Sequence, residues 1–195
     1  MTAKPAGTVR VTGGRIKGLK LEVPEGQGVR PTADRARETL FNILINRFRK
    51  PGGESVLKDA RVLDAFAGTG ALGLEAWSRG ADFVAFAELS REHRRVLEQN
   101  LTKAKLPSAD FIVEPEATDR GQAFDLIFAD PPYGQGEALI ARLLAKAGLW
   151  SADTLVVWER DKGPVDLPSG WQLVHEKPVG RTVFSFLAPE TASMW

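Results

Sequence analysis

From Val56 onward, short apolar runs alternate with longer amphipathic stretches, and this alternation limits the possible folds more than any other feature of the sequence. Continuous apolar runs of this length are typical of strands buried on both faces of a parallel sheet. The runs cover residues 61–66, 82–87, 110–113, 124–129 and 154–158, and the predicted helices cover residues 71–79, 90–104 and 136–147. A chain with this alternation is expected to form a doubly wound α/β sheet.

The first fifty residues follow a different pattern. Residues 8–23 alternate apolar and polar side chains around Gly13-Gly14, which indicates short strands joined by turns. A helix is predicted to begin with Thr32 as its N-cap and to run to about Phe48. Pro51-Gly-Gly53 then ends this helix.

These changes of pattern predict the domain organisation. Residues 171–175 and 182–187, separated by Pro178-Val-Gly180, indicate a closing antiparallel hairpin. We therefore expect an α/β fold with a doubly wound, mostly parallel sheet, a C-terminal antiparallel hairpin and a small basic N-terminal β/α appendage. The appendage is predicted to cover residues 1–53 and the main domain residues 54–195.

Charge is distributed unevenly between these two parts. Residues 1–50 hold eleven Lys and Arg against four Asp and Glu, a net charge of +7. The rest of the chain holds 15 basic and 21 acidic residues, a net charge of −6. A basic segment on an acidic body indicates that one surface contacts a polyanion. Ordinary solvated surface charge is the alternative interpretation.

Scarce residue types exclude several classes of protein. The chain has no cysteine and two histidines, which excludes a disulfide scaffold, a thiol nucleophile and a Cys/His zinc site, so we expect no metal. The first seven residues lack the apolar run of a secretory signal. No apolar run approaches the roughly 18 residues that span a membrane. We therefore expect a cytoplasmic protein that does not contact membranes.

A glycine-rich segment follows the first parallel strand. Residues 64–75 read Asp-Ala-Phe-Ala-Gly-Thr-Gly-Ala-Leu-Gly-Leu-Glu and contain the pattern G-x-G-x-x-G. Glycines let the backbone approach a ligand closely. Glu88 follows the next strand and is placed to accept hydrogen bonds from ribose hydroxyls. The acid Asp64 would repel a pyrophosphate but attract an ammonium group, which favours S-adenosylmethionine over a dinucleotide. A buried, hydrogen-bonded acid at the end of the strand is the alternative role for Asp64.

A second motif, Asp130-Pro131-Pro132-Tyr133, follows the fourth parallel strand. The two prolines fix the backbone and remove N–H donors, so the turn presents only acceptors. An exocyclic amino group of a nucleobase is a donor of two protons and suits such a turn, while Tyr133 is suited to stack on the base. The motif therefore predicts transfer of a methyl group to a base amine without a covalent intermediate.

Together these motifs resemble class I S-adenosylmethionine-dependent amino-methyltransferases. The segments Arg15-Ile-Lys-Gly18 and Arg30 to Leu44 narrow the resemblance to the RsmD family, which methylates guanine N2 in 16S rRNA of the bacterial small ribosomal subunit. The resemblance implies that Asp130 and the Pro131 carbonyl hold the amine beside Pro132 and Tyr133. It also implies a cofactor site that comprises Asp64, Ala67, Gly68, Gly70, Glu88 and Glu116. Glu116 lies in Val113-Glu-Pro-Glu-Ala117, where such enzymes usually have a small or polar residue followed by Asp or Asn.

The basic segment supplies the predicted contacts to RNA. Arg15, Lys17, Lys20, Arg30 and Arg35 are expected to grip the RNA backbone, although Arg30 is also close enough to the main domain to contact the carboxylate of the cofactor. The family expectation is a monomer that acts on 16S rRNA within small ribosomal subunit particles.

Three other functions compete with this interpretation. A DNA adenine-N6 or cytosine-N4 methyltransferase would use the same Asp-Pro-Pro-Tyr chemistry, but 195 residues leave no room for a target-recognition domain. An NAD-binding oxidoreductase conflicts with Asp64, and a catalytically silent RNA-binding module conflicts with the complete turn at Asp130. Asp125 and Glu159 are interpreted as ordinary strand-end acids.

Overall fold

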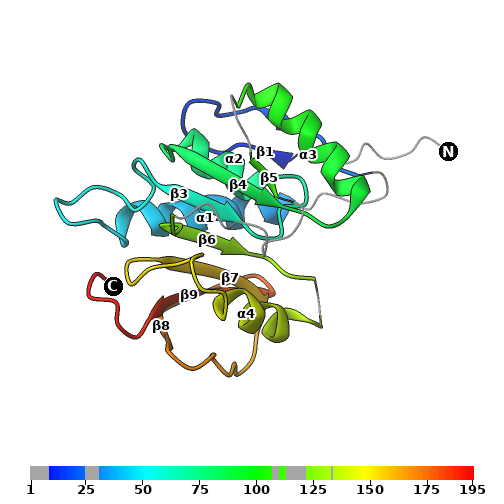
Figure 1. The fold of residues 1–195 in the computed structure, drawn as a ribbon. Coiled ribbons are helices and arrows are strands. Elements are labelled where there is room, and N and C mark those ends of the chain that lie inside the picture. Colours follow the sequence, from blue (N-terminus) through cyan, green and yellow to red (C-terminus); the bar gives the residue numbers. More distant parts are fainter. Residues whose placement is uncertain (1–8, 25–30, 107–109, 113–121, 133) are drawn as a thin grey trace.

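The computed structural model describes residues 9–24, 31–106, 110–112, 122–132 and 134–195, and all structural statements concern these residues. The helices are α1 (Pro31–Asn46), α2 (Ala71–Ser78), α3 (Arg91–Ala104) and α4 (Gly136–Leu144). The strands are β1 (Val9–Arg10), β2 (Lys20–Leu21), β3 (Arg61–Asp64), β4 (Phe83–Ala87), β5 (Asp110–Ile112), β6 (Leu126–Ala129), β7 (Leu155–Asp161), β8 (Trp171–Val179) and β9 (Thr182–Pro189) (Figure 1).

The main sheet has the strand order β5-β4-β3-β6-β7-β9-β8. Strands β5, β4, β3, β6 and β7 pair in parallel, and β9 pairs antiparallel with both β7 and β8. The predicted fold class is therefore confirmed. The chain moves outward from β3 to β5 and then returns to β6 on the other side of β3, so the order reverses between β3 and β6. Open α/β sheets bind ligands at such a reversal, beyond the carboxyl ends of the strands.

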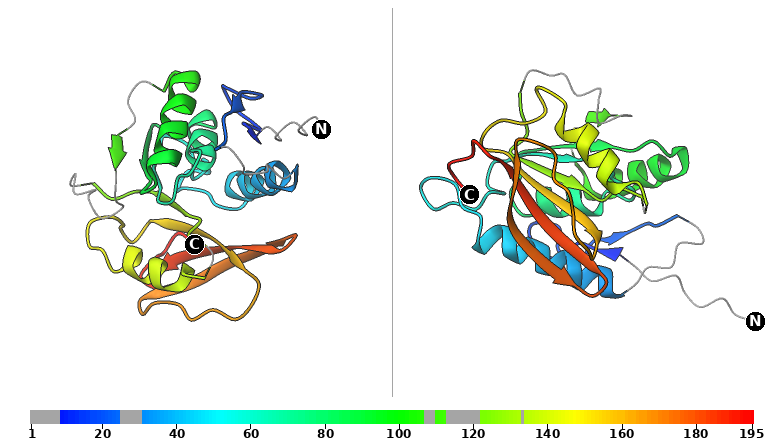
Figure 2. Two further views of the ribbon diagram at one scale, coloured as in Figure 1. Left: turned by 90° about the vertical axis from the view of Figure 1, so that its right-hand side faces the viewer. Right: turned by 90° about the horizontal axis from the view of Figure 1, so that it is seen from below.

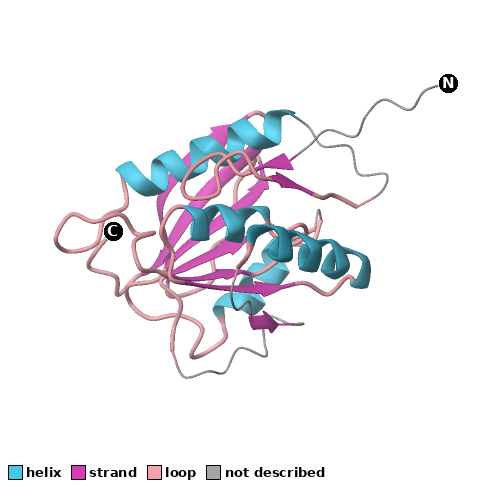
Figure 3. Cartoon of the chain, turned by 90° about the horizontal axis from the view of Figure 1, so that it is seen from above, coloured by secondary structure: helices cyan, strands magenta, loops and turns pink. Residues whose placement is uncertain are grey.

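The buried apolar residues form one cluster on each face of the sheet. Side chains of β3 alternate between them, with Val62 in the cluster that holds α1, α2 and α3 and Leu63 in the cluster that holds α4. Figure 2 shows α1 and α4 on opposite sides of the sheet, and Figure 3 shows the strands as a layer between helices. Burial on both faces explains why the parallel strands are continuously apolar.

Two boundaries differ from the prediction. Helix α1 begins at Pro31, so Thr32 lies inside the helix and is not its N-cap; proline suits the first helical position because its fixed φ matches the helix. Strand β8 runs through Pro178 to Val179, so the turn of the hairpin lies at Gly180 and Arg181. Proline is tolerated in β8 because this is the edge strand of the sheet. Ser90 caps α3 as predicted, since its hydroxyl accepts a hydrogen bond from the His93 N–H.

A buried acid joins the N-terminal segment to α2. Glu75 is fully buried, and its carboxylate accepts hydrogen bonds of 2.7 Å from the backbone N–H and the hydroxyl of Thr12. It also accepts a hydrogen bond of 2.7 Å from Arg79 and lies 3.5 Å from the Arg37 guanidinium. Residues on both sides of position 53 share one core, as the ring of Phe48 stacks on Phe186 at 4.9 Å. The division at residue 53 stays a prediction about function.

No helix in the described part of the chain is long and apolar enough to cross a membrane. The described residues also contain no group of three or more His, Asp and Glu side chains placed to hold a metal ion.

Candidate active site

Four neighbouring strands each bring an acidic residue to the carboxyl edge of the sheet. Glu88 follows β4, Asp64 ends β3, Asp130 follows β6, and Glu159 lies near the end of β7. Because these strands are adjacent in the order β4-β3-β6-β7, the four residues form a row across the edge, which we call the acidic row. Asp64 and Asp130, the middle residues of the row, flank the point where the strand order reverses. The acidic row therefore crosses the position at which this fold binds ligands.

The glycine loop lies beside the half of the acidic row that β4 and β3 contribute. Gly68 and Gly70 have φ angles of 52° and 79°, a left-handed conformation that favours glycine. A Cβ atom on Gly70 would lie 2.4 Å from Leu97, whereas one on Gly68 would meet nothing within 4 Å. Gly73 has an ordinary φ but lies so close to β4 that a Cβ would be 2.4 Å from the Phe86 ring. The loop is therefore tight at Gly70 and Gly73 and open beside Gly68, where a ligand has room.

Glu88 is held in place by the backbone around it. Its two carboxylate oxygens accept one hydrogen bond each, of 2.8 Å from the Gly68 N–H and 2.7 Å from the Ser90 N–H. Ala67, just before this contact, donates its own N–H to the Ala87 carbonyl at 2.9 Å. A carboxylate has about four lone-pair sites, so Glu88 keeps acceptor capacity for two further donors without losing these bonds.

Asp64 is almost fully buried, with 2% of its surface exposed. It accepts a hydrogen bond of 2.9 Å from the Gly73 N–H at the start of α2. Burial, together with the nearby charges of Asp130 and Glu88, raises the pKa of Asp64 from 3.8 to about 7. The hydrogen bond from Gly73 opposes this rise but does not overcome it. A cation bound next to Asp64 would therefore stabilise its ionised form.

Asp130 and Glu159 line one cavity at the other end of the acidic row. The cavity has a volume of about 470 Å³ and lies between the turn after β6, the start of α4 and the ends of β7 and β9. Part of the surface of Asp130 is exposed to solvent. Burial of its carboxyl group nevertheless raises the pKa of Asp130 to about 6. Burial and the charge of Asp130 raise the pKa of Glu159 to about 7, against a hydrogen bond from Thr182 that lowers it.

The structure brings together most of the predicted catalytic and cofactor residues. Pro131 and Pro132 line the same cavity as Asp130. The predicted cofactor residues lie in the glycine loop or beside it: Asp64, Ala67, Gly68, Gly70 and Glu88. Tyr133, Glu116 and Arg30 lie outside the described residues. Their predicted roles therefore stay predictions.

The basic residues do not gather at the acidic row. Helix α1 begins at the carboxyl edge and carries the exposed Arg35 in its second turn, whereas the turn with Arg15 and Lys17 reaches the opposite edge (Figure 1). Arg15 donates its backbone N–H to the Ser78 carbonyl at the end of α2, and its guanidinium lies 4.6 Å from the Trp77 ring centre. Lys20 is exposed in β2. Any contact of Arg15 and Lys17 with RNA would therefore lie away from the row.

Sequence reasoning missed Glu159 as a candidate site residue. A single acid after an apolar run is ordinary at a strand end, and Asp125 does have such a role, since it accepts a hydrogen bond of 2.7 Å from the Arg61 N–H. The pairing of β6 with β7 distinguishes Glu159. Ala129 is opposite Trp158, and each of these two residues is followed by an acid, Asp130 and Glu159. The signal is present in the sequence only if the two strands are already aligned.

Comparisons with known proteins show which proteins the chain resembles. Residues 9–188 match the model of the family described as conserved hypothetical protein 95. The chain is 36% identical over 186 residues to ribosomal RNA small subunit methyltransferase D of Escherichia coli K12, with 92% of this chain and 89% of that protein covered. The protein of the same name from Haemophilus influenzae is 34% identical over 192 residues, which covers 92% of this chain and 93% of the relative.

A solved structure extends the similarity to three dimensions. The protein yhhF of Escherichia coli superimposes with a TM-score of 0.75 at 35% sequence identity. The match covers 94% of this chain and 99% of that one. The likeness therefore includes the N-terminal segment as well as the sheet.

Proposed function

The chain belongs to the RsmD family, whose model it matches over residues 9–188, and we propose that it transfers a methyl group from S-adenosylmethionine to N2 of a guanine in 16S rRNA. The relatives named above support the substrate, since their names assign them to small-subunit ribosomal RNA. The observation that carries the chemistry is the acidic row, in which the glycine loop and the Asp130 turn meet at the reversal of strand order.

The residues at the β4 and β3 side of the acidic row fit S-adenosylmethionine. The cofactor has an ammonium group, a sulfonium and a ribose, and Asp64 is a buried acid that gains from a neighbouring cation. Glu88 retains two acceptor sites and is fixed by Gly68 and Ser90, which suits a pair of ribose hydroxyls. The open space beside Gly68 leaves the backbone accessible. We assign cofactor binding to Asp64, Ala67, Gly68, Gly70 and Glu88.

At the other end of the row, Asp130 orients the nucleophile. Its carboxylate and the Pro131 carbonyl accept the two protons of the guanine amine, which directs the nitrogen lone pair away from both. When bound, S-adenosylmethionine supplies an electrophilic methyl group whose carbon–sulfur bond breaks as the guanine N2 attacks, leaving a neutral thioether. The nitrogen then carries one proton too many, and Asp130, with its pKa of about 6, is placed to accept it. Most of the rate comes from positioning the two reactants.

The experiment that tests this function is methyl transfer from radiolabelled S-adenosylmethionine. Naked 16S rRNA, small ribosomal subunits and duplex DNA are offered separately, and the labelled nucleoside is identified by chromatography after digestion. We expect N2-methylguanosine from one of the RNA substrates. Label in adenine or cytosine of DNA would support the rival DNA methyltransferase, and absence of label from all three substrates would contradict the proposal.

A variant of Asp130 separates chemistry from cofactor binding. Asp130→Ala is expected to lose at least about 100-fold in turnover, the usual scale for removal of a key polar group from an active site. Its affinity for S-adenosylmethionine should stay within a few fold, because Asp130 is assigned to the guanine amine. Near-normal turnover of this variant would show that Asp130 is a structural residue.

The basic residues are proposed to hold RNA phosphates at two places. Arg35 lies on the helix that begins at the carboxyl edge, Arg15 and Lys17 lie in the turn that reaches the opposite edge, and Lys20 is exposed in β2 (Figure 1). Reversal of Arg15, Lys17 and Lys20 to Glu should weaken RNA binding and flatten its salt dependence, since each lost phosphate contact removes about 0.7–0.9 from the slope of log K against log salt. Equal binding by parent and triple variant would show that this surface does not touch RNA.

A further inference from the structure

The cavity beside Asp130 has the size and position of a site for a base. Its volume of about 470 Å³ lies within the roughly 300–1,000 Å³ of small-molecule pockets. Pro131 forms part of its wall, so the cavity opens directly onto the turn to which we assign the guanine amine. A base that leaves an RNA stack to react must enter a pocket that reads its Watson–Crick edge. The walls of this cavity should therefore carry hydrogen-bonding groups besides Asp130.

Glu159 is such a group, and strand pairing fixes its place. Ala129 of β6 is opposite Trp158 of β7, so Asp130 and Glu159 occupy the next position on two parallel strands. Adjacent strands lie about 4.8 Å apart, a spacing that places the two acids beside each other along the cavity wall. Glu159 is half-buried and accepts a hydrogen bond from Thr182 of β9, which holds it toward this wall.

A buried donor borders the same cavity. Trp158 is 2% exposed, and no described residue accepts a hydrogen bond from its indole N–H. This nitrogen lies 3.7 Å from the position of a Cβ on Gly136, and a ring carbon of Pro131 lies 3.6 Å from the same position. Gly136, Pro131 and Trp158 all line the cavity. An unpartnered buried donor that lines the same cavity as two carboxyl groups indicates a ligand with both donors and an acceptor.

The rim of the cavity carries charges of both signs, because the exposed acids Glu137 and Asp161 line it together with basic residues. Lys162 lines the cavity and is exposed. Arg160 also lines it but is already engaged, because its guanidinium pairs with Glu176 and donates to the Ser185 hydroxyl at 2.8 Å. Lys162 is thus placed to meet a phosphate, while the carboxyl groups are left for the base.

We propose that Glu159 determines the specificity for guanine by accepting a hydrogen bond from the N1–H, beside the N2 amine held by Asp130. The proposal rests on the proposed function. On the Watson–Crick edge of guanine the N1–H is adjacent to the N2 amine, so two neighbouring donors face two neighbouring acids. Adenine and cytosine present a lone pair at the equivalent ring nitrogen, so neither base offers Glu159 the donor that the guanine N1–H supplies. Glu159 thereby rejects these bases even though Asp130 would accept their amines.

The base 2-aminopurine tests this contact, because it keeps the N2 amine but has a lone pair at N1 and lacks O6; the variants of Glu159 then separate the effect of N1 from that of O6. The guanine that wild-type enzyme methylates is first mapped, and 2-aminopurine is then placed there by ligation of 16S rRNA fragments. The wild type is expected to methylate guanine at least about 10-fold faster than 2-aminopurine, as a charged hydrogen bond is worth this factor or more. Equal rates on the two bases would overturn the proposal without any variant.

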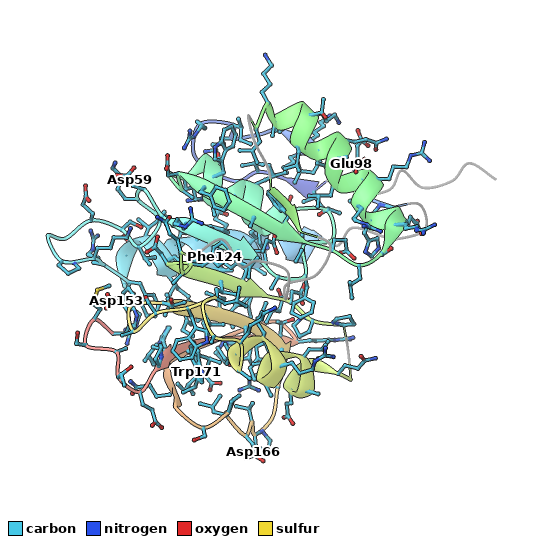
Figure 4. All side chains as sticks on the ribbon, viewed as in Figure 1. Asp59, Glu98, Phe124, Asp153, Asp166 and Trp171 are labelled. Carbon is cyan, nitrogen blue, oxygen red and sulfur yellow. The ribbon has the colours of Figure 1, made fainter. Side chains whose placement is uncertain are left out.

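Two variants then assign the preference to Glu159. Glu159→Gln can turn its amide to donate to N1 of 2-aminopurine, and Glu159→Ala removes the contact, so both should reduce the ratio of the two rates by about 10-fold or more. The matched control is Glu98→Gln, an exposed residue on α3 far from β7 and α4 (Figure 4), which should keep the wild-type ratio. Calorimetry with S-adenosylmethionine checks that each variant is folded.

The outcomes distinguish this proposal from the proposed function. If Glu159 variants lose the same factor on both bases, the residue is structural and the proposal is wrong, whereas the methyltransferase function stands. If the wild type produces no N2-methylguanosine at all, the proposed function fails and the proposal falls with it.

Discussion

Replacement of Asp64 by asparagine tests whether the acidic row is maintained at a cost in stability. The pKa of Asp64 is about 7 in the folded protein and near 3.8 when the chain is unfolded, so between these values the folded state binds more protons. Stability contributed at this position is therefore present at low pH and is lost as pH rises from about 4 to about 7. The whole interval corresponds to about 4 kcal/mol, of which roughly 2–3 kcal/mol falls between pH 5 and pH 8.

Asparagine removes the titration while keeping the local hydrogen bond. Its side-chain oxygen can still accept from the Gly73 N–H, which now bonds to Asp64 at 2.9 Å. Any fixed cost of the new amide is independent of pH, so the informative quantity is the difference in unfolding free energy between variant and wild type. This difference should shift in favour of Asp64→Asn by roughly 2–3 kcal/mol between pH 5 and pH 8.

Urea denaturation at several pH values between 5 and 8 measures the difference directly. Glu98→Gln, on the exposed face of α3, serves as the control and should show no trend with pH. Calorimetry should show that Asp64→Asn binds S-adenosylmethionine more weakly, because the ammonium group loses its partner. A difference in stability that stays constant across this range would refute the assignment of a raised pKa to Asp64.

Three further predictions follow from contacts around α2 and the glycine loop. Glu88→Ala should weaken S-adenosylmethionine binding by about 1.5–3 kcal/mol in calorimetry and also lower stability by about 1–2 kcal/mol, since the Gly68 and Ser90 N–H groups lose their acceptor. Gly73→Ala should cost about 1–3 kcal/mol in urea denaturation, because its Cβ would lie 2.4 Å from the Phe86 ring. Glu75→Gln removes the carboxylate that pairs with the largely buried Arg79 and should cost about 3–5 kcal/mol, with faster proteolysis of the N-terminal segment.

The parallel part of the fold could be predicted because its signals are local. Each buried strand is a continuous apolar run, and each helix that follows begins near a turn of glycine, serine or proline. Gly68, Gly70 and Gly73 indicated the loop by residue type alone, since each has a positive φ or a close approach that other residues resist. Asp64, Glu88 and Asp130 could be placed at the edge of the sheet because each ends or directly follows a strand whose pattern was already clear.

The residues that escaped prediction act through partners distant in sequence. Glu75 ends an apolar stretch, and nothing local shows that Thr12, 63 residues earlier, supplies two donors to its carboxylate. The same limit applied to Arg15, which the charge pattern assigned to the RNA backbone without giving its place in the fold. The structure places Arg15 at the far end of α2, because its backbone bonds to Ser78. Charge patterning identifies a surface, whereas long-range pairing decides where that surface lies.

Under the proposed function, the acidic row would serve two ligands of different kinds. Its outer members, Glu88 and Glu159, each have hydrogen-bond donors of the protein that fix the carboxyl group. The inner members, Asp64 and Asp130, carry raised pKa values and lie near enough for the charge of one to affect the other. A cationic cofactor beside Asp64 would offset that repulsion and favour ionised Asp130. Cofactor binding would thereby prepare the acceptor that the incoming amine requires, which makes binding of the cofactor before the base the favourable order.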